Sequence, residues 1–311
     1  MTAAVVAAAG RRLVRRPRLA VRLLRFPALV PFRWVRARLY RSLSWPLALR
    51  LHMETEVTVA DGSRMLVRTD DLVGRILAIS GVWEPNVAAA FTRALAPGNV
   101  CLDIGAHIGY YTLLAARLVG PQGHVYAFEP SPANYRSLRA NVDLNGLRNV
   151  TTAELAVGEQ ERRAVLYEGP PHNTGLTTLS PVLAAKSATP PRETIVDVGP
   201  VTSVVPPDDL ARVGVIKIDV EWLEIEVLRS LAPVFELDHG LSVLVEFTPH
   251  RDAPDAASQL AAVCEAHGFT MYRVPSGYSL ERLFPESLEE PTPVEAEALP
   301  DKKKCDLLLL R

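Results

Sequence analysis

The sequence has few cysteines, no long hydrophobic run and no acidic residue near its start, and each absence excludes a class of protein. Its 311 residues include three cysteines, which form no C-x-x-C pair. A disulfide-rich secreted fold and a structural zinc site are therefore not expected. No apolar run reaches the roughly 18 residues of a membrane-spanning helix. Residues 2–10 are apolar, but charges follow them rather than precede them, unlike a secretory signal. We therefore expect a cytoplasmic protein, soluble or membrane-peripheral.

Acidic residues are absent from the first 53 positions. This segment holds twelve arginines, and because the whole chain has a formal net charge of −1, residues 54–311 carry −13. Arginines recur at helical spacing from Arg11 to Arg25, and a second amphipathic stretch runs from Phe32 to Leu43. Several interpretations stay open: peripheral contact of residues 11–41 with an acidic membrane, contact with acidic ligands, a solvated helix pair packed on the rest of the protein, or a mis-assigned start codon. The acidic body argues against nucleic-acid binding.

The pattern of apolar residues predicts three parts, namely a basic extension (1–50), an N-terminal cap (51–97) and a larger domain (98–311). Within the cap, alternating runs flank Asp61-Gly62, which is typical of a β-hairpin, and a helix follows from Val87 to Leu95. The larger domain alternates strands and helices, which predicts a parallel sheet with helices on both faces. The strands are expected at 100–105, 124–129, 150–157, 213–220, 242–247, 269–274 and 306–310, and the helices at 111–119, 132–144, 223–231 and 256–267. Residues 169–207 read mostly as loop with short strands.

A glycine-rich turn after the first of these strands is the strongest local signal. It reads Asp103-Ile-Gly105-Ala-His107-Ile-Gly109, and Glu129 ends the next strand. Glycines let a backbone approach a ligand closely, and a helix start offers free N–H groups. The spacing is neither G-x-G-x-x-G nor a Walker loop, which disfavours a nicotinamide dehydrogenase and a P-loop protein. An aspartate before the first glycine would attract a cation, and a carboxylate at Glu129 suits ribose hydroxyls. The alternative is a βα turn without a ligand.

Three charged residues, Lys217, Asp219 and Glu221, follow one another at alternate positions at the end of the fourth strand. Because strand side chains alternate, we expect all three to face one way. A central parallel strand is buried on both faces, so these charges need partners or a ligand. A buried ion-pair network that only stabilises the strand end is the alternative interpretation.

Together these motifs resemble the FkbM family of S-adenosylmethionine-dependent methyltransferases. The resemblance runs from about Asp71 to the C-terminus and rests on Glu84-Pro85, the block 103–147, AVGE (156–159), Asn173-Thr-Gly175 and IKIDVE (216–221). It implies an α/β fold with a doubly wound, Rossmann-like class I methyltransferase sheet of strand order 3-2-1-4-5-7-6 and a small N-terminal hairpin-helix cap. It also implies a bacterial enzyme that methylates a hydroxyl of a sugar, glycan or polyketide-type secondary metabolite.

The resemblance assigns residues to the cofactor. S-Adenosylmethionine is expected to contact Asp103, Gly105, His107 and Gly109 with its methionine end, Glu129 with its ribose, and Ala156 and Val157 near its adenine.

For catalysis, either Asp219 or Glu221 is expected to act as the base, with Lys217 orienting it. His107 and His250 are weaker candidates for the base. Glu84, Asn173 and Trp222 are candidate substrate residues. No metal is expected, although Asp219, Glu221 and Glu246 could supply oxygen ligands to Mg²⁺.

The sequence departs from the family pattern in three places. His107 stands where Asn is usual, Trp222 where Gly is usual, and Val204-Val205-Pro206 where a Leu-Asp pair is usual. The second and third departures motivate an alternative function: a catalytically impaired protein of the same fold that binds the cofactor or acts as a scaffold.

Overall fold

The chain forms two compact units. The computed structural model describes residues 17–30, 35, 38–187, 190–237, 239–249, 255–277, 279, 282, 287–299 and 304–311, so His250 and Arg11 lie outside the described residues. Unit 1 comprises residues 1–85, 170–175 and 277–288, and unit 2 comprises residues 86–169, 176–276 and 289–311. The division into extension, cap and larger domain stays a prediction.

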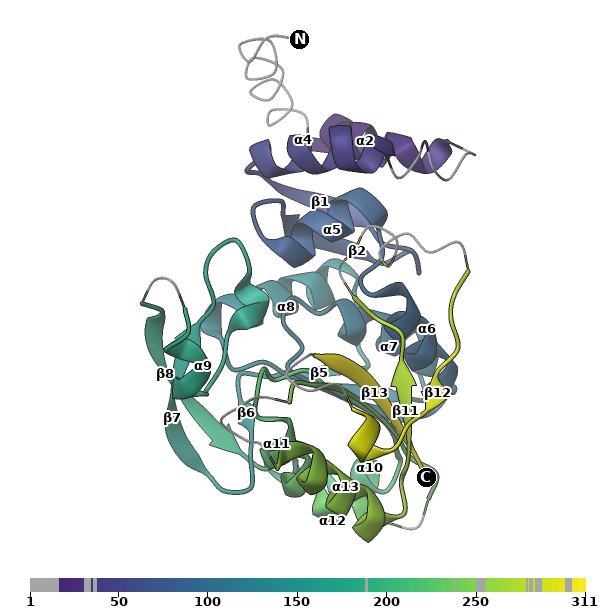
Figure 1. Ribbon diagram of the computed structural model, residues 1–311, viewed down its shortest axis with the longest axis vertical. Coiled ribbons are helices and arrows are strands. Elements are labelled where there is room, and N and C mark those ends of the chain that lie inside the picture. The colour runs from purple at the N-terminus through teal and green to yellow at the C-terminus, as the bar shows by residue number, and fades with distance from the viewer. Residues whose placement is uncertain are drawn as a thin grey trace. The chain divides into compact units, whose positions relative to one another are not determined.

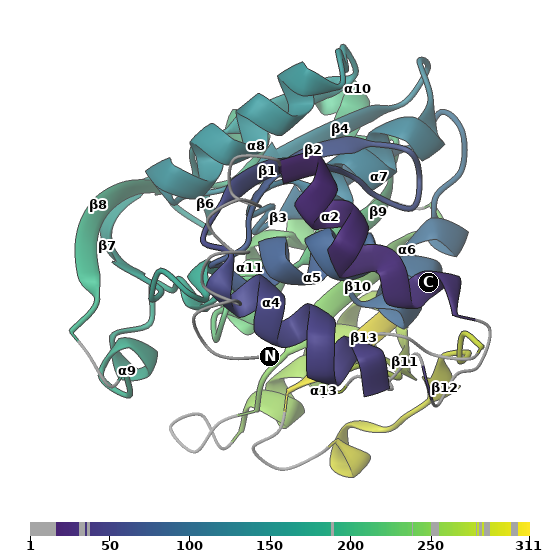
Figure 2. The same ribbon diagram turned by 90° about the horizontal axis from the view of Figure 1, so that it is seen from above.

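Unit 1 combines helices with a two-stranded hairpin. Its elements are α2 (Pro17–Arg25), η1 (Phe26–Leu29), the π-helical turn η2 (Tyr40–Ser44), α4 (Trp45–Arg50), β1 (Glu54–Thr58), β2 (Arg64–Arg68) and α5 (Leu72–Ser80). The hairpin prediction is confirmed, because β1 and β2 pair antiparallel around a turn in which Gly62 has φ +86°. Helix α5 was not predicted. Helices α2 and α4 lie side by side (Figures 1 and 2).

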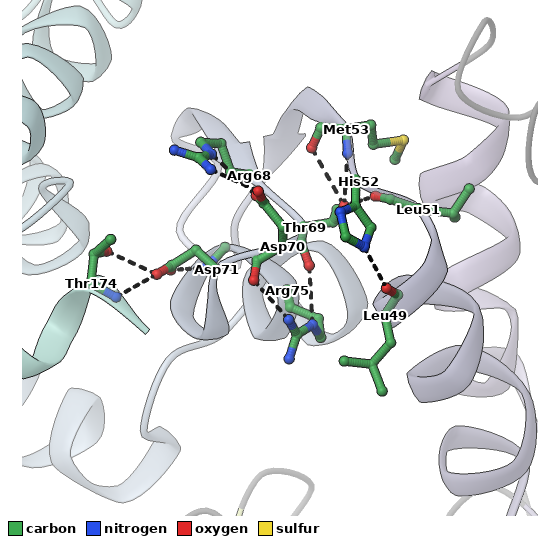
Figure 3. Close-up of polar contacts among 11 residues, drawn as sticks. Leu49, Leu51, His52, Met53, Arg68, Thr69, Asp70, Asp71, Arg75 and Thr174 are labelled. Carbon is green, nitrogen blue, oxygen red and sulfur yellow. Dashed lines mark hydrogen bonds and ion pairs between the residues drawn. The ribbon is translucent and has the colours of Figure 1, made fainter. Parts of the chain in front are cut away.

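Figure 3 shows the junction of β2 and α5, where Asp71 joins two segments of unit 1. One carboxylate oxygen of Asp71 caps α5 by accepting hydrogen bonds from the N–H groups of Val73 (3.0 Å) and Gly74 (3.2 Å). The other accepts from the N–H (2.9 Å) and hydroxyl (2.8 Å) of Thr174. Asp71 therefore holds segment 170–175, which includes Asn173, on unit 1.

Unit 2 is built on an eight-stranded sheet in the order β12-β11-β13-β10-β9-β3-β4-β5. The strands are β3 (Val100–Ile104), β4 (His124–Phe128), β5 (Val150–Ala153), β9 (Val213–Ile218), β10 (Ser242–Phe247), β11 (Thr270–Val274), β12 (Thr292–Pro293) and β13 (Cys305–Leu310). The five strands from β5 to β10 are parallel, and β13 is antiparallel to both neighbours. Apart from the two-residue β12, this is the expected order 3-2-1-4-5-7-6, so the predicted sheet is confirmed.

Helices cover both faces of this sheet, as predicted (Figure 1). Helices α7 (Tyr110–Val119) and α8 (Pro132–Leu144) pack on one face, and α11 (Glu224–Ser230), α12 (Ala232–Phe235) and α13 (Ala256–His267) on the other. Helix α6 (Pro85–Ala94) places Phe91 edge to face against Tyr111 of α7, with ring centroids 5.2 Å apart. Because strand side chains alternate, Leu102 and Ile104 of β3 enter the core beside α11 to α13, and Asp103 faces α7.

A second sheet of unit 2 corrects the prediction of a single strand at 150–157. It contains β6 (Ala156–Val157), β8 (Arg192–Gly199) and β7 (Arg162–Glu168), so the expected strand 150–157 is two strands in different sheets. Residues 169–207, expected to be mostly loop with short strands, contain the eight-residue β8. Strands β7 and β8 are largely exposed and rich in charge, so they lack the apolar run that marks a buried strand. The remaining short helices are η3 (Thr174–Leu176), α9 (Pro181–Ala184), η4 (Val201–Ser203), α10 (Pro207–Leu210) and η5 (Ala296–Ala298).

Within the part of the chain that the structure describes, no helix combines the length and the apolar character needed to cross a membrane.

Candidate active site

The carboxyl ends of neighbouring parallel strands bring most of the predicted site residues together in unit 2. Asp103 of β3 is in register with Ala127 of β4 on one side and Lys217 of β9 on the other. Glu129 directly follows β4, and Asp219 directly follows β9. The two motifs that the sequence analysis singled out therefore form one edge of the sheet.

The neighbouring backbone leaves room only for a glycine at position 105 of the glycine-rich turn. Gly105 has φ +83°, and a Cβ atom there would collide with the carbonyl oxygen of Asp219. The N–H of Asp219 donates to the carbonyl of Ile104 at 2.9 Å, so the loops after β3 and β9 are in direct contact. Gly105 was expected to allow a close approach to a ligand. Its immediate neighbour in the structure is the other site loop, and the approach to a ligand stays a prediction.

His107 occupies a backbone conformation that explains the residue types found at this position. Its φ is +51°, in the left-handed region where Asn and His are tolerated better than most residues. Its N–H donates to Oε2 of Glu129 at 2.8 Å, while Oε1 of Glu129 accepts from the N–H of Ser131 at 2.9 Å. These two donors orient the Glu129 carboxylate at the end of β4. Burial nevertheless raises the pKa of Glu129 to about 7.

Asp103 is a buried carboxylate that accepts a hydrogen bond from a neighbouring hydroxyl. The hydroxyl of Thr112, from α7, donates to its Oδ2 at 2.5 Å. Burial raises the pKa of Asp103 to about 6, although the Thr112 hydrogen bond and the charge of Lys217 oppose that rise. The site therefore holds two carboxylates, Asp103 and Glu129, that lack enough positive charge around them to stay fully ionised near neutral pH.

The other predicted cofactor residues lie in well-packed positions. Gly109 precedes α7 with φ +93°. Ala156 and Val157 form β6, and both are buried beside β8.

The catalytic motif does not continue the strand as expected. Strand β9 ends at Ile218, and Glu221 and Trp222 have φ values of +45° and +76°. The alternation that was to place Lys217, Asp219 and Glu221 on one side therefore stops before Glu221. The buried Lys217 ammonium lies 3.4 Å from Oδ2 of Asp219 and 5.2 Å from the ring centre of Tyr111, which is itself buried.

Carboxylates from two strand ends nevertheless converge. One oxygen each of Asp219, Glu221 and Glu246 lie within 4.8 Å of one another. Glu246 is the fifth residue of β10 and is in register with Asp306 of β13. The Lys304 ammonium forms an ion pair with Glu246 and lies 4.0 Å from Oε1 of Glu221.

Lys304 and Asp306 were missed by the sequence analysis. Asp306 could have been noticed as a charge that opens the apolar run 307–310, since a buried strand otherwise reads as apolar. No local signal marks Lys304, because its partners lie far away in the sequence.

The surroundings separate the pKa values of the two candidate bases. Burial would raise the pKa of Asp219, but the charges of Lys217 and Lys304 outweigh it and leave this pKa below its ordinary value. Burial raises the pKa of Glu221 to about 7, against the charge of Lys304 and with the help of the Asp219 charge. Neighbouring carboxyl groups with diverging pKa values are typical of sites that move protons.

Trp222 occupies a position whose backbone conformation favours glycine. Its φ of +76° is left-handed, which accounts for the Gly that is usual there. The structure holds it in place by a hydrogen bond from its N–H to Oε1 of Glu224 (3.0 Å) and by the Lys186 ammonium, 4.1 Å from the ring centre. Burial raises the pKa of Glu224 to about 8. Glu84 and Asn173, the other candidate substrate residues, belong to unit 1.

Comparison with known proteins connects this geometry to one family. The family model described as "Methyltransferase FkbM domain" matches residues 103–275. The chain is 31% identical over 199 residues to the 31-O-demethyl-FK506 methyltransferase FkbM of Streptomyces tacrolimicus, which covers 57% of this chain and 75% of that protein. It is 30% identical over 145 residues to Methyltransferase 1 of Beauveria bassiana strain ARSEF 2860, over 42% of this chain and 57% of that protein. The crystal structure of methyltransferase FkbM from Methylobacillus flagellatus KT aligns with 96% of this chain and 60% of its own, at 13% identity and a TM-score of 0.42.

The contact between the two site loops predicts an unequal cost for two glycine substitutions. Gly98 and Gly105 have nearly the same φ, +85° and +83°, but only Gly105 lacks room for a Cβ. Gly98→Ala should lower the free energy of unfolding by about 1 kcal/mol through backbone strain alone. Gly105→Ala should cost at least about 2 kcal/mol more, because Asp219 must move. Urea unfolding of both variants measures the difference, and equal losses would show that the loops are not in contact.

Proposed function

This chain therefore belongs to the FkbM family of methyltransferases, and we propose that it transfers the methyl group of S-adenosylmethionine to a hydroxyl of a sugar, glycan or polyketide-type secondary metabolite. The observation that carries this proposal is the pair of buried carboxylates, Asp103 and Glu129, at the sheet edge that also carries Glu221. The pKa of Glu221 is raised to about 7. Transfer to oxygen is also supported by the relative named as a 31-O-demethyl-FK506 methyltransferase. A bacterial origin and a cytoplasmic location stay predictions.

The residues at the ends of β3 and β4 fit this cofactor by their chemistry. S-Adenosylmethionine carries a cationic sulfonium, a cationic ammonium and two ribose hydroxyls that can donate hydrogen bonds. Asp103 is 1% exposed and has a raised pKa, so a cation beside it would stabilise its ionised form. Glu129 is held by two backbone N–H groups and keeps acceptor capacity for hydroxyl donors. We assign the methionine end to Asp103 and the loop 105–109, and the ribose to Glu129.

The bound cofactor supplies an electrophilic methyl group, and the protein must position and deprotonate the acceptor. A neutral alcohol is a weak nucleophile, so a base within hydrogen-bond reach is needed. Glu221 suits this role better than Asp219, because its pKa of about 7 lets it accept a proton at neutral pH and release it afterwards. With the cofactor bound to supply the methyl group, Glu221 would accept the proton that the acceptor hydroxyl loses. Asp219 stays ionised beside Lys217 and orients that ammonium.

We further propose that Lys304 supplies the cation that this acidic cluster needs. Asp219, Glu221 and Glu246 have the oxygen ligands and the spacing that a divalent metal prefers. The Lys304 ammonium already contacts Glu246 and approaches Glu221. A lysine in this place screens the repulsion between the carboxylates and, by opposing the rise in the pKa of Glu221, favours its ionised form, which can accept a proton.

The Trp222 backbone favours one alternative function. Trp222 adopts a conformation of about 1–3 kcal/mol strain next to the proposed base. Such strain is compatible with a role in catalysis. It is equally compatible with a scaffold protein in which the indole of Trp222 fills the acceptor site. Cofactor binding without methyl transfer to any polyol or macrolide would favour the scaffold.

The role of Glu221 predicts a dependence of the rate on pH. Because the base must be deprotonated, kcat should rise with pH and level off above a pKa of about 7. Glu221→Gln should lower kcat by about 10²–10⁴-fold and remove this dependence. The rate is measured as S-adenosylhomocysteine released with a panel of polyol and macrolide acceptors.

Glu226→Gln is the matched control, because Glu226 pairs with Arg162 on the surface and should keep the wild-type profile. An unchanged rate and pH profile in the Glu221 variant would remove Glu221 from the mechanism.

The position of Lys304 predicts that removing it creates a metal site. Lys304→Ala should bind Mn²⁺ at least about tenfold more tightly than the wild type, because three carboxylates lose their cation. Electron paramagnetic resonance of free Mn²⁺ measures this without any turnover. Lys186→Ala, which removes the ammonium over Trp222, should leave Mn²⁺ binding unchanged. Tight Mn²⁺ binding by the wild type would contradict the assignment.

A further inference from the structure

Exposed large hydrophobic side chains are concentrated at the start of unit 1. Among the described residues there are eleven, and six of them lie between residues 19 and 49: Leu19, Leu23, Phe26, Leu29, Leu43 and Leu49. Phe26 is 50% exposed and Leu29 is 79% exposed. Scattered single leucines on a surface need no explanation, but a local group of this size marks an interaction surface.

One face of helix α2 packs against the rest of unit 1, and another carries exposed side chains of this group. Ala20 and Leu24 are fully buried in unit 1. The Arg25 guanidinium anchors the helix end by donating to the carbonyls of Leu77 (2.8 Å) and Thr58 (2.8 Å). Helix α2 is therefore already packed on unit 1, and its exposed leucines take no part in that packing.

The exposed residues form a continuous stripe, which we call the α2 stripe: Leu19, Leu23, Phe26 and Leu29. Leu19 and Leu23 are four residues apart and so lie on one side of α2, while Phe26 and Leu29 are the first and last residues of η1. The exposed Arg18 and Arg22 flank the stripe along the same helix. Helix α4 lies beside α2 and adds Leu49 and Arg50, both exposed (Figure 2).

The charge of the segment that carries the stripe has one sign. Residues 1–53 contain twelve arginines and neither aspartate nor glutamate. A symmetric contact between two copies through this stripe would bring arginines together with no acid from either segment to pair with them. A surface that is both apolar and negatively charged is provided by an anionic lipid bilayer, in which acyl chains lie just beneath phosphate groups.

We propose that the α2 stripe inserts into the interface of an anionic phospholipid membrane while Arg18 and Arg22 bind the lipid phosphates. This binding is peripheral and requires no methyl transfer, so its test does not depend on the proposed function. The sequence alone suggested contact through arginines. The structure adds the leucines and phenylalanine that would enter the bilayer and shows which apolar residues, Ala20 and Leu24, face the protein instead.

The test is sedimentation of the full chain with vesicles. We expect binding to phosphatidylcholine vesicles that contain about 30% phosphatidylglycerol, weak binding to phosphatidylcholine alone, and release at about 0.5 M NaCl. The double substitution Leu23→Gln with Phe26→Gln should lower the partition coefficient at least about tenfold, because it removes the inserting side chains. The matched control is Val182→Gln with Ile195→Gln, which changes two exposed apolar side chains outside the stripe and should bind like the wild type.

Two results would overturn the proposal. One is wild-type protein that stays in the supernatant with the anionic vesicles. The other is a lipid-independent dimer that the stripe variant converts to monomer in analytical ultracentrifugation, which would make a second copy the partner. Thermal melting of each variant confirms that a lost interaction does not reflect a lost fold.

Discussion

The central physical constraint of this protein is negative charge buried at one edge of a parallel sheet. Asp103, Glu129, Glu246 and Asp306 are each less than 5% exposed, and Glu221 and Asp219 lie beside them. Two lysines, Lys217 and Lys304, supply the nearby positive charge. Burying a carboxylate is unfavourable unless it is paired or hydrogen-bonded, so this edge is maintained at a cost in stability. A cationic ligand that binds there would relieve that cost.

The rest of the site follows from how closely the loops at this edge approach one another. Gly105 allows the loop after β3 to touch the loop after β9, so the proposed cofactor residues and the proposed base share one backbone contact. His107 links the same loop to Glu129 of the next strand. Binding at one part of the edge is therefore expected to position the other. Strain at Glu221 and Trp222 belongs to the same loop, which is where proteins commonly store it for function.

Local sequence patterns were sufficient to place an element where its apolar residues recurred with a strong period and its ends were clearly marked. The helices 132–144 and 256–267 and the strand 242–247 lie where the pattern placed them. The strand order needed the family resemblance, because periodicity does not say which strands are neighbours. Strand β7 was missed and the bounds of β8 were not predicted, since both strands are partly exposed and pair with each other rather than with the main sheet.

The candidate site was predictable to the extent that it consists of strand ends. Asp103, Glu129, Lys217 and Asp219 could be placed together because parallel strands end at one edge. The direction of Glu221 could not be predicted, because a left-handed turn at a non-glycine residue contradicts the usual preference. Lys304 could not be predicted either, since only tertiary structure brings it to Glu221 and Glu246.

Calorimetric titration of the full chain with S-adenosylmethionine, near pH 6.5 and in two buffers of different ionisation enthalpy, tests the central claim most directly. Because the pKa values of Asp103 and Glu129 are about 6 and about 7 before binding, a cationic ligand should release up to about one proton. Asp103→Asn, which keeps the size of the side chain, should weaken binding at least about tenfold. Binding without proton release, and with equal affinity in Asp103→Asn, would contradict the account.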